Sequence, residues 1–413
     1  MKIGFDCRSN FIYNNPCCVC GLEKGVYNFL MFKCFNVIIL ITFFILNLGI
    51  STCWATDVLP NVTAKSAIVM DAQTGRVIYA KDAESRRYPA STTKMMTLIV
   101  ALEKGDLNDI VTASEKASTT EGSSLWLENG EKLRLLDMLY GIMLISGNDA
   151  TVAVAEHLAG SVENYAKLMT EKAHEIGANN TSFANSSGLP DPKHYSTAHD
   201  LAKIAAYGYK NPMFEQIVST KEKIIPWAKN DYGRELFNEN RMLWLYDGGN
   251  GVKTGYTDAA GRCLVSAAKR DGMQLIAVVL DSEYMWNDSI ALLNYGFSHI
   301  QSVNLFHKGD VLKTSKVLSG KKEYVELYLD KDIDIPVVDG EKDKFTTVID
   351  APDSVEAEIT KGDRVGAVHI LYDNKEVVSA DLLANDDIER RSFFITIYQS
   401  IMNTIEFFKN KLH

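Results

Sequence analysis

Residues 88–102 of the chain read YPASTTKMMTLIVAL. Pro89 precedes a serine, and apolar residues recur at helical spacing after Lys94, so we expect Ser91 to lie at the start of a helix. Residues three apart on a helix share a face, which lets the Lys94 amine reach the Ser91 hydroxyl. Such a pair suits an activated serine nucleophile. Taken alone, it could equally be an N-capped surface helix.

Two further short motifs follow in order, Ser146-Gly147-Asn148 and Lys253-Thr254-Gly255. The first two patterns are weak by themselves, because S-x-x-K recurs at Ser266–Lys269 and Ser319–Lys322 and chance supplies such matches. The K-T-G pattern occurs once in the chain. A phosphate-binding loop is excluded, since Val252 stands where that motif requires glycine. All three motifs in order outweigh the surface-helix alternative.

Each motif supplies a group that acyl transfer to a serine requires. A serine hydroxyl needs a neighbouring base. Lys94 can be that base only if burial or a nearby cation, such as Lys253, favours its neutral form. Ser146 can relay a proton, and Asn148 can hold a substrate amide by hydrogen bonds. The predicted catalytic residues are Ser91, Lys94 and Ser146.

The third motif is expected to bind substrate. A lysine and a threonine hydroxyl suit a carboxylate, and a glycine lets the backbone approach closely. The oxyanion should meet the backbone N–H groups of Ser91 and Tyr256. The predicted substrate-binding residues are Asn148, Lys253, Thr254, Gly255 and Tyr256. We expect no metal and no cofactor, because the sequence has no H-E-x-x-H motif and no evident histidine cluster. His194 and His199 are predicted to be surface or capping residues.

Strand and helix patterns surround these motifs. Residues 58–300 begin and end with strand pairs and are helical between them, which predicts an α/β domain with one antiparallel sheet flanked by helices. Residues 301–385 carry short strand patterns separated by turn residues, which predicts a small all-β domain. The strand pairs are Ser66–Asp71 with Val77–Lys81, and Arg262–Lys269 with Met273–Leu280. The clearest runs of the second domain are Tyr324–Leu329, Ile333–Val338 and Val365–Leu371.

The first 55 residues are predicted to be an N-terminal extension and a signal peptide. Lys33 precedes an apolar run over residues 37–50, and small residues surround the expected cleavage site after Ala55. The run is shorter than the roughly 20 residues of a comfortable spanning helix. An uncleaved anchor is the alternative. Met31 would begin a signal peptide of ordinary length, so we expect translation to start there.

Residues 388–413 are predicted to form an amphipathic helix. A large apolar face with a polar, mildly basic back suits a membrane interface. The alternative is a helix packed on the protein's own surface. The apolar face consists of Phe394, Ile397, Tyr398, Ile401, Met402, Ile405, Phe408 and Leu412.

Composition adds two exclusions. The chain has 413 residues and a net charge of −10, so no general attraction to nucleic acid is expected. Of its seven cysteines, only Cys263 lies beyond the predicted signal peptide. The exported protein would therefore have no internal disulfide, and we expect Cys263 to be a packed core residue.

With the three motifs in place, the chain resembles a D-alanyl-D-alanine carboxypeptidase, a low-molecular-mass penicillin-binding protein of bacteria. The resemblance covers about residues 58–413. It implies a β-lactamase-like and transpeptidase-like fold, followed by the small all-β domain. It also implies attachment of the C-terminal helix to the outer face of the cytoplasmic membrane. Further matching stretches are GSSL at 122–125, NSSGLP at 185–190 and NYGF at 294–297.

The same resemblance implies the reaction. Ser91 would be acylated by the D-Ala-D-Ala end of peptidoglycan stem peptides, D-alanine would leave, and water would release the shortened stem. β-Lactams would acylate Ser91 as inhibitors. Some relatives place an arginine after the last sheet strand, whereas residues 281–288 contain no basic residue. Carboxylate recognition should therefore depend more heavily on Lys253 and Thr254.

Three alternatives remain open. A β-lactamase would share the motifs but usually needs a deacylating glutamate between the second and third; Glu215, Glu222 and Glu235 lie there, none in a convincing loop. A D,D-endopeptidase would use the same site on cross-links. A catalytically idle wall-binding protein would keep only the fold, and the intact serine, lysines and asparagine count against it.

Overall fold

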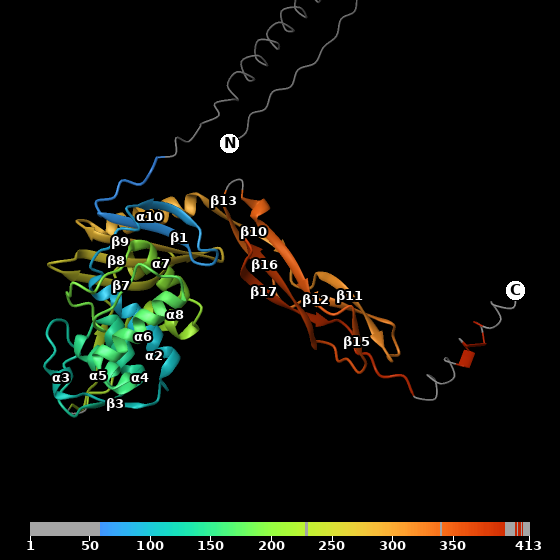
Figure 1. Ribbon diagram of the computed structural model, residues 1–413, viewed down its shortest axis with the longest axis horizontal. Coiled ribbons are helices and arrows are strands. Elements are labelled where there is room, and N and C mark those ends of the chain that lie inside the picture. Colours follow the sequence, from blue (N-terminus) through green and yellow to red (C-terminus); the bar gives the residue numbers. More distant parts are fainter. Residues whose placement is uncertain are drawn as a thin grey trace, which may run out of the picture. The chain divides into compact units, whose positions relative to one another are not determined.

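The computed structural model describes residues 58–227, 230–338 and 341–392, together with 401, 402, 404, 405 and 407. An α/β part lies between Ser66 and Ser298, and an all-β part follows between Ile300 and Ala384 (Figure 1). The predicted signal peptide lies outside the described residues. So does most of the predicted C-terminal helix: of its ten described residues, 401, 402, 404, 405 and 407 are helical. Residues 388–392 are not, so the predicted start at 388 is wrong; Ile388 and Arg390 form β-bridges to Ile359 and Gly320 instead.

The α/β part is built on a five-stranded antiparallel sheet in the order β2-β1-β9-β8-β7. Its side chains alternate between two cores: Ile68 and Met70 face the larger one, whereas Ala67 and Val69 face the smaller. Burial on both faces explains the nearly continuous apolar runs of these strands. The strands are β1 (Ser66–Asp71), β2 (Val77–Lys81), β7 (Gly249–Thr257), β8 (Gly261–Arg270) and β9 (Met273–Ser282).

Both predicted hairpins are confirmed. The β8–β9 turn places Asp271 at φ 49° and Gly272 at φ 79°. Two successive positive φ angles are the requirement of the type I′ turns that suit the twist of an antiparallel pair. The Asp-Gly dipeptide therefore fixes the register of the two central strands.

Helices cover both faces of this sheet (Figure 1). Helix α10 (Met285–Ser298) packs on the smaller core. The larger core lies under six helices: α2 (Lys94–Lys104), α4 (Leu135–Leu144), α5 (Asn148–Ala159), α6 (Val162–Glu175), α7 (Ala198–Gly208) and α8 (Pro212–Ser219). The shorter elements are η1 (Ala90–Thr93), β3 (Ile110–Thr112), α3 (Glu115–Ser118), β4 (Lys132–Arg134), β5 (Glu222–Ile225), β6 (Arg234–Phe237) and α9 (Met242–Leu245).

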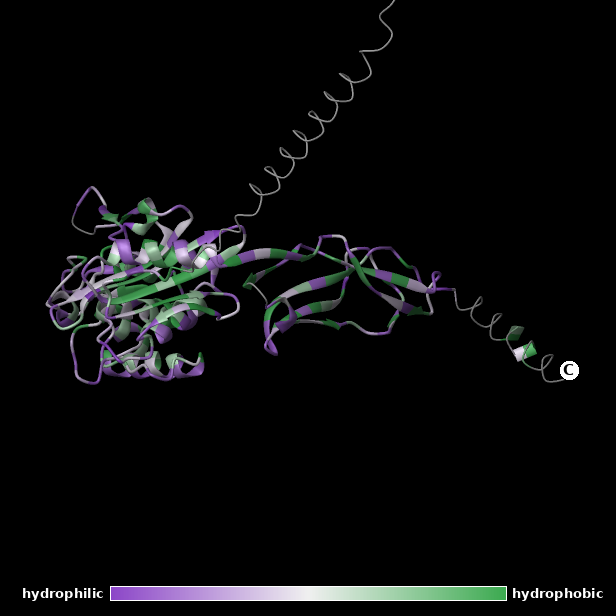
Figure 2. Cartoon of the chain, turned by 90° about the horizontal axis from the view of Figure 1, so that it is seen from above, coloured by the Kyte–Doolittle hydropathy of each residue, from purple (hydrophilic) through white to green (hydrophobic). Residues whose placement is uncertain are grey.

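The all-β part has its own apolar core, as predicted. Strand β10 pairs with β13, and six strands form a sheet in the order β14-β16-β17-β12-β11-β15. Apolar residues lie along the strands of both parts, with hydrophilic residues in many of the loops (Figure 2). The strands are β10 (Ile300–Phe306), β11 (Val311–Leu318), β12 (Tyr324–Leu329), β13 (Ile333–Val338), β14 (Phe345–Asp350), β15 (Ser354–Glu356), β16 (Arg364–Tyr372) and β17 (Lys375–Ala384).

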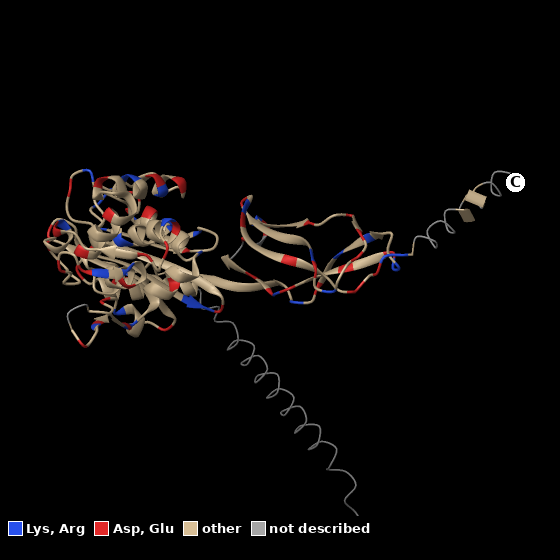
Figure 3. Ribbon diagram, turned by 90° about the horizontal axis from the view of Figure 1, so that it is seen from below, with Lys and Arg blue, Asp and Glu red and all other residues tan. Residues whose placement is uncertain are grey.

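The charged residues are mixed in sign over the face drawn in Figure 3. Among the described residues, no group of three or more metal-ligating side chains is close enough to hold a metal ion. A search of the same residues finds no helix with the length and apolar character needed to span a membrane.

Candidate active site

Ser91 lies in a 3₁₀ turn, η1, that leads directly into α2. The sequence correctly predicted that a helix starts near Ser91. The residue itself lies in a 3₁₀ turn, which is wound more tightly than the α-helix that follows. In a 3₁₀ turn, side chains at positions i and i+3 eclipse each other. This geometry brings Lys94 Nζ to 2.9 Å from Ser91 Oγ.

The Lys94 amine is fully buried and has two further partners. Its nitrogen lies 2.7 Å from Asn148 Oδ1 and 2.8 Å from the backbone oxygen of Ser187. Both partners can only accept hydrogen bonds. A protonated amine can donate to all three oxygens, whereas a neutral amine that donates to Asn148 and Ser187 can turn its lone pair toward Ser91 Oγ. Burial, and then the charge of Lys253, holds the pKa of Lys94 well below its usual value, as the sequence required.

Asn148 is the first residue of α5, and its amide orients Lys94. The amide nitrogen donates to the Glu121 oxygen at 2.7 Å, which fixes the oxygen toward Lys94. The next residue, Asp149, accepts from the backbone nitrogens of Leu125 and Leu127 at 2.8 and 3.0 Å. Asp149 thereby ties the 121–127 loop to the start of α5.

Ser146 stands two residues before Asn148, with φ 64°. It is buried beside the start of α5. The Lys94 amine bonds Ser91, Asn148 and Ser187, so in the described part of the chain Ser146 is not one of its hydrogen-bond partners.

Strand β7 brings the third motif to the serine. Lys253 is buried, and its amine donates to Thr254 Oγ1 at 3.3 Å. A Cβ added to Gly255 would lie 2.9 Å from the backbone nitrogen of Ser91, so only glycine allows this approach. The Tyr256 side chain is 61% exposed and its hydroxyl donates to Asp258, so the predicted role of Tyr256 depends on its backbone N–H, which follows Gly255 on β7.

The 185–190 loop supplies a contact that the sequence did not predict. Its Ser187 carbonyl accepts from Lys94, and Asn185 Oδ1 accepts from the backbone nitrogen of Gly188 at 2.8 Å. Gly188 has φ 93°, and an added Cβ would overlap the backbone oxygen of Ala90. The family-like NSSGLP stretch at 185–190 pointed to this loop, but its side chains do not indicate that the Ser187 carbonyl would bond Lys94.

Glu239 is a second residue that the sequence did not single out. It lies between β6 and α9, in the interval between the second and third motifs. Its carboxylate accepts from Thr254 Oγ1 at 3.3 Å and lies 3.9 Å from Lys253 Nζ. The acidic residues considered in that interval are elsewhere: Glu215 accepts from Asn250, and Glu222 and Glu235 are exposed on the β5–β6 hairpin.

The surface placement predicted for His194 is wrong. His194 is 1% exposed, and its Nε2 lies 2.8 Å from Thr93 Oγ1. Its Nδ1 accepts from the Ala184 backbone nitrogen at 3.1 Å, so Nε2 carries the hydrogen that bonds Thr93. Burial lowers the pKa of His194 to about 4, which keeps it neutral. His199 is partly exposed and pairs with Glu84.

Cys263 is a core residue, as expected. It is fully buried on β8, and burial raises the pKa of its thiol to about 11. A thiol in this state is a poor nucleophile at neutral pH.

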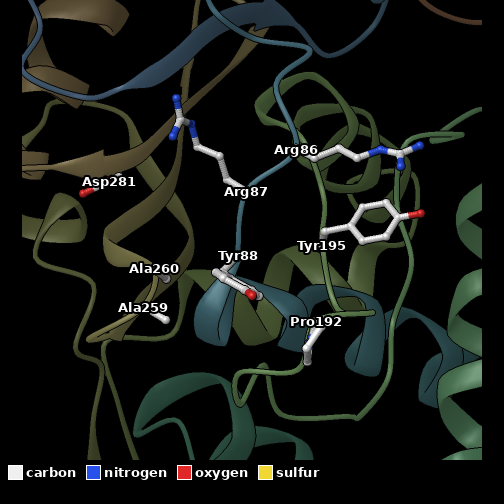
Figure 4. Close-up of a pocket in the computed structure, with 8 residues that line it drawn as sticks. All are labelled: Arg86, Arg87, Tyr88, Pro192, Tyr195, Ala259, Ala260 and Asp281. Carbon is white, nitrogen blue, oxygen red and sulfur yellow. The ribbon is translucent and has the colours of Figure 1, made fainter.

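A hollow of about 470 Å³ lies on the segment leading to Ser91 (Figure 4). None of the motif residues lines it. Arg86 lies over the Tyr195 ring at 4.4 Å, and Arg87 Nε donates to Ser66 Oγ at 2.5 Å. The hollow is therefore separate from the Ser91–Lys94 pair. It is lined by Arg86, Arg87, Tyr88, Pro192, Tyr195, Ala259, Ala260 and Asp281.

This geometry can be compared with known proteins. Residues 54–284 match the family model described as D-alanyl-D-alanine carboxypeptidase. The chain belongs to this family. Residues 301–390 match the C-terminal domain of penicillin-binding protein 5. The enzyme is thus a serine-type hydrolase with the penicillin-binding protein fold, an α/β catalytic domain followed by an all-β domain.

Individual relatives in the carboxypeptidase family agree. The D-alanyl-D-alanine carboxypeptidase DacF of Bacillus subtilis is 35% identical, over 83% of this chain and 90% of its own. Penicillin binding protein 5 from Haemophilus influenzae has a TM-score of 0.58 at 31% identity, covering 81% of this chain and 99% of its own. A Streptomyces K15 DD-transpeptidase mutant, at 34% identity and a TM-score of 0.55, covers 58% of this chain and 100% of its own.

Proposed function

We propose that this carboxypeptidase removes the terminal D-alanine from peptidoglycan stem pentapeptides through an acyl-enzyme on Ser91. β-Lactams would inhibit it by acylating the same oxygen. The observation that carries the proposal is the set of three contacts around Lys94 Nζ. In the neutral amine that the reaction needs, Asn148 and Ser187 accept the two hydrogens and the lone pair is free to take the serine proton.

In the first half of the reaction, Ser91 Oγ attacks the carbonyl carbon of the penultimate D-alanine while its proton passes to Lys94 Nζ. The backbone N–H groups of Ser91 and Tyr256 stabilise the oxyanion, and the close approach of Gly255 supports this role. The C–N bond then breaks, and the leaving amine takes the proton from Lys94, with Ser146 as relay. D-alanine departs and leaves an ester on Ser91.

In the second half, water replaces D-alanine. Lys94 takes a proton from the water as it attacks the ester carbonyl, and the proton returns to Ser91 Oγ as the C–O bond breaks. The carboxylate of the substrate binds Lys253 and Thr254 throughout the first half. The positive charge and the hydroxyl lie side by side on β7, which supports this assignment.

The test is labelling of the full chain with a fluorescent penicillin. Wild type should be labelled covalently, and Ser91→Ala should lose the label while keeping its thermal unfolding midpoint. Incubation with a stem pentapeptide should release one D-alanine per peptide. Rapid turnover of a cephalosporin without D-alanine release would contradict the proposal and favour a β-lactamase, and cleavage of cross-linked dimers alone would favour an endopeptidase.

We further propose that the enzyme is exported and attached to the outer face of the cytoplasmic membrane by residues 388–413. The basic, apolar and small-residue regions of residues 31–55 support export. The amphipathic pattern of residues 388–413 supports peripheral attachment.

A further inference from the structure

Glu239 places a carboxylate beside the two groups assigned to the substrate carboxylate. One of its oxygens accepts from Thr254 Oγ1 at 3.3 Å and lies 3.9 Å from Lys253 Nζ. A substrate carboxylate bound by the same two groups would need the same position. Two carboxylates that close together repel each other.

The backbone of Glu239 is held in place. Its nitrogen donates to the Leu144 oxygen at 3.0 Å, at the end of α4. The neighbouring Asn238 and Asn240 are buried, and the Asn238 side chain donates to the Thr220 oxygen at 2.9 Å. The loop is therefore fixed by contacts that do not involve the Glu239 carboxylate.

The side chain of Glu239 has a different environment from its partners. It is 47% exposed, whereas the Lys253 side chain is 1% exposed. A half-exposed carboxylate can exchange its protein partners for water at small cost. Glu239 can thus leave the position toward solvent, while Lys253 and Thr254 stay.

We propose that Glu239 is a specificity-determining residue that occupies the substrate-carboxylate position in the free enzyme and is displaced when a carboxylate-bearing substrate or β-lactam binds. This inference rests on the proposed function of Lys253 and Thr254. Among ligands with a carboxylate, those whose carboxylate fits Lys253 and Thr254 best displace Glu239 most readily. A ligand without that carboxylate does not compete with Glu239 for Lys253 and Thr254.

A glutamate between the second and third motifs could instead activate the deacylating water. Such a base must reach the ester on Ser91. The contacts of the Glu239 carboxylate in the described structure are with Thr254 and Lys253, on the side of the substrate carboxylate. The geometry therefore favours competition at that position.

The experiment compares benzylpenicillin, which carries a carboxylate, with its methyl ester, which does not. The second-order rate constant for acylation of the full-length protein is measured by intact-protein mass spectrometry. Glu239→Gln should accelerate acylation by benzylpenicillin about 3- to 10-fold more than acylation by the ester, because only the acid competes with Glu239. Loss of the Glu239 charge near Lys94 acts on both compounds alike, so the ratio of the two rate constants is the readout. Glu239→Asp, which keeps the charge but shortens its reach, should show a smaller acceleration.

Glu235→Gln is the matched control, since it removes the same charge from an exposed position on β6. Its rate constants should equal those of wild type. Equal responses of acid and ester to Glu239→Gln, or no response, would overturn the inference alone. If Glu239→Gln loses its acyl group more slowly but is not acylated faster, the inference would be wrong and Glu239 would be assigned as the deacylating base. Failure of wild type to be acylated by either compound would overturn the proposed function, and the inference with it.

Discussion

The proposed reaction needs two buried lysines in opposite protonation states, Lys94 neutral and Lys253 charged. Lys94 has three hydrogen-bond partners, and burial holds its pKa well below the usual value, which favours the neutral amine. Lys253 has the carboxylate of Glu239 at 3.9 Å, which partly offsets burial. The same side chain type can therefore serve as a base at one position and as a cation at the other.

This difference predicts a bell-shaped pH dependence of acylation. Lys94 must be neutral, so the rate should rise with pH as Lys94 loses its proton. Lys253 must be charged; burial lowers its pKa to about 8 although Glu239 raises it, so the rate should fall above about pH 8. The charged groups facing Lys253 are Lys94 and Glu239.

The measurement is the rate constant of benzylpenicillin acylation between pH 5 and pH 10, on the order of one point per half unit. Lys253→Arg should remove the alkaline limb, because arginine stays charged across this range. A wild-type rate that stays constant from pH 8 to pH 10 would contradict the assignment of Lys253.

At the residue scale, the three sequence motifs predicted the side chains that meet at the site. The structure brings Ser91, Lys94 and Asn148 into contact, and it places Gly255 against Ser91. The Ser187 carbonyl was not predictable, because every residue has one. Glu239 was missed because buried contacts of its neighbours with distant residues determine where its carboxylate lies.

At the scale of elements, the serine turn is held between two glycine contacts. Gly255 of β7 approaches it from one side, and Gly188 of the 185–190 loop approaches Ala90 from the other. Each glycine lets a backbone come closer than a side chain would permit. The sheet and the helical layer are thus connected at the nucleophile itself.

Gly255→Ala should separate β7 from the serine turn. The added Cβ would meet the backbone nitrogen of Ser91 at 2.9 Å, so the strand must shift. We expect penicillin acylation to fall by about 10²-fold through the displaced oxyanion donors. The free energy of unfolding should fall by only about 1–3 kcal/mol, as for other overpacked sites.

Gly272→Ala is the control for this prediction. Gly272 has φ 79° and open space around it, so alanine there adds backbone strain without a collision. It should lower stability by about 1 kcal/mol and leave the acylation rate of the folded protein unchanged. Equal rates for Gly255→Ala and wild type would show that β7 does not determine the oxyanion geometry.

Element prediction succeeded where local chemistry dominates. The β8–β9 hairpin follows from apolar strands around Asp271-Gly272, and β12 and β13 match their predicted runs. The β5–β6 hairpin and α9 were not predicted. They are four residues long each, and short elements depend on tertiary packing more than on their own sequence.

At the scale of the whole molecule, the chemistry lies in the α/β part. The Streptomyces K15 relative covers 58% of this chain over its own full length, so a protein of this fold can be shorter than this chain. The all-β part has a separate core. Its position in the sequence, between the catalytic domain and the proposed anchor, makes attachment and catalysis separable.

Deletion of residues 393–413 tests that separation. If the proposed anchor is correct, the variant should move from the membrane fraction to the soluble fraction, because it lacks the amphipathic segment assigned to the interface. Its rate of penicillin acylation should stay within about 2-fold of wild type, since the site is untouched. A variant that remains with the membranes after a high-salt wash would show that another segment provides the attachment.

The lowered pKa of Lys94 has a consequence for folding as well as for reactivity. Burial holds the pKa of this lysine in the folded protein well below the value of about 10.5 that it has in the unfolded chain. Between the two pKa values the unfolded state binds more protons, so the free energy of unfolding rises with pH there. Evolution for heat resistance alone should therefore favour replacement of Lys94 by an apolar residue such as methionine. Under the proposed function the resulting protein would be more heat-stable and would not be acylated by β-lactams, so thermal stability and reactivity would make opposing demands on one side chain.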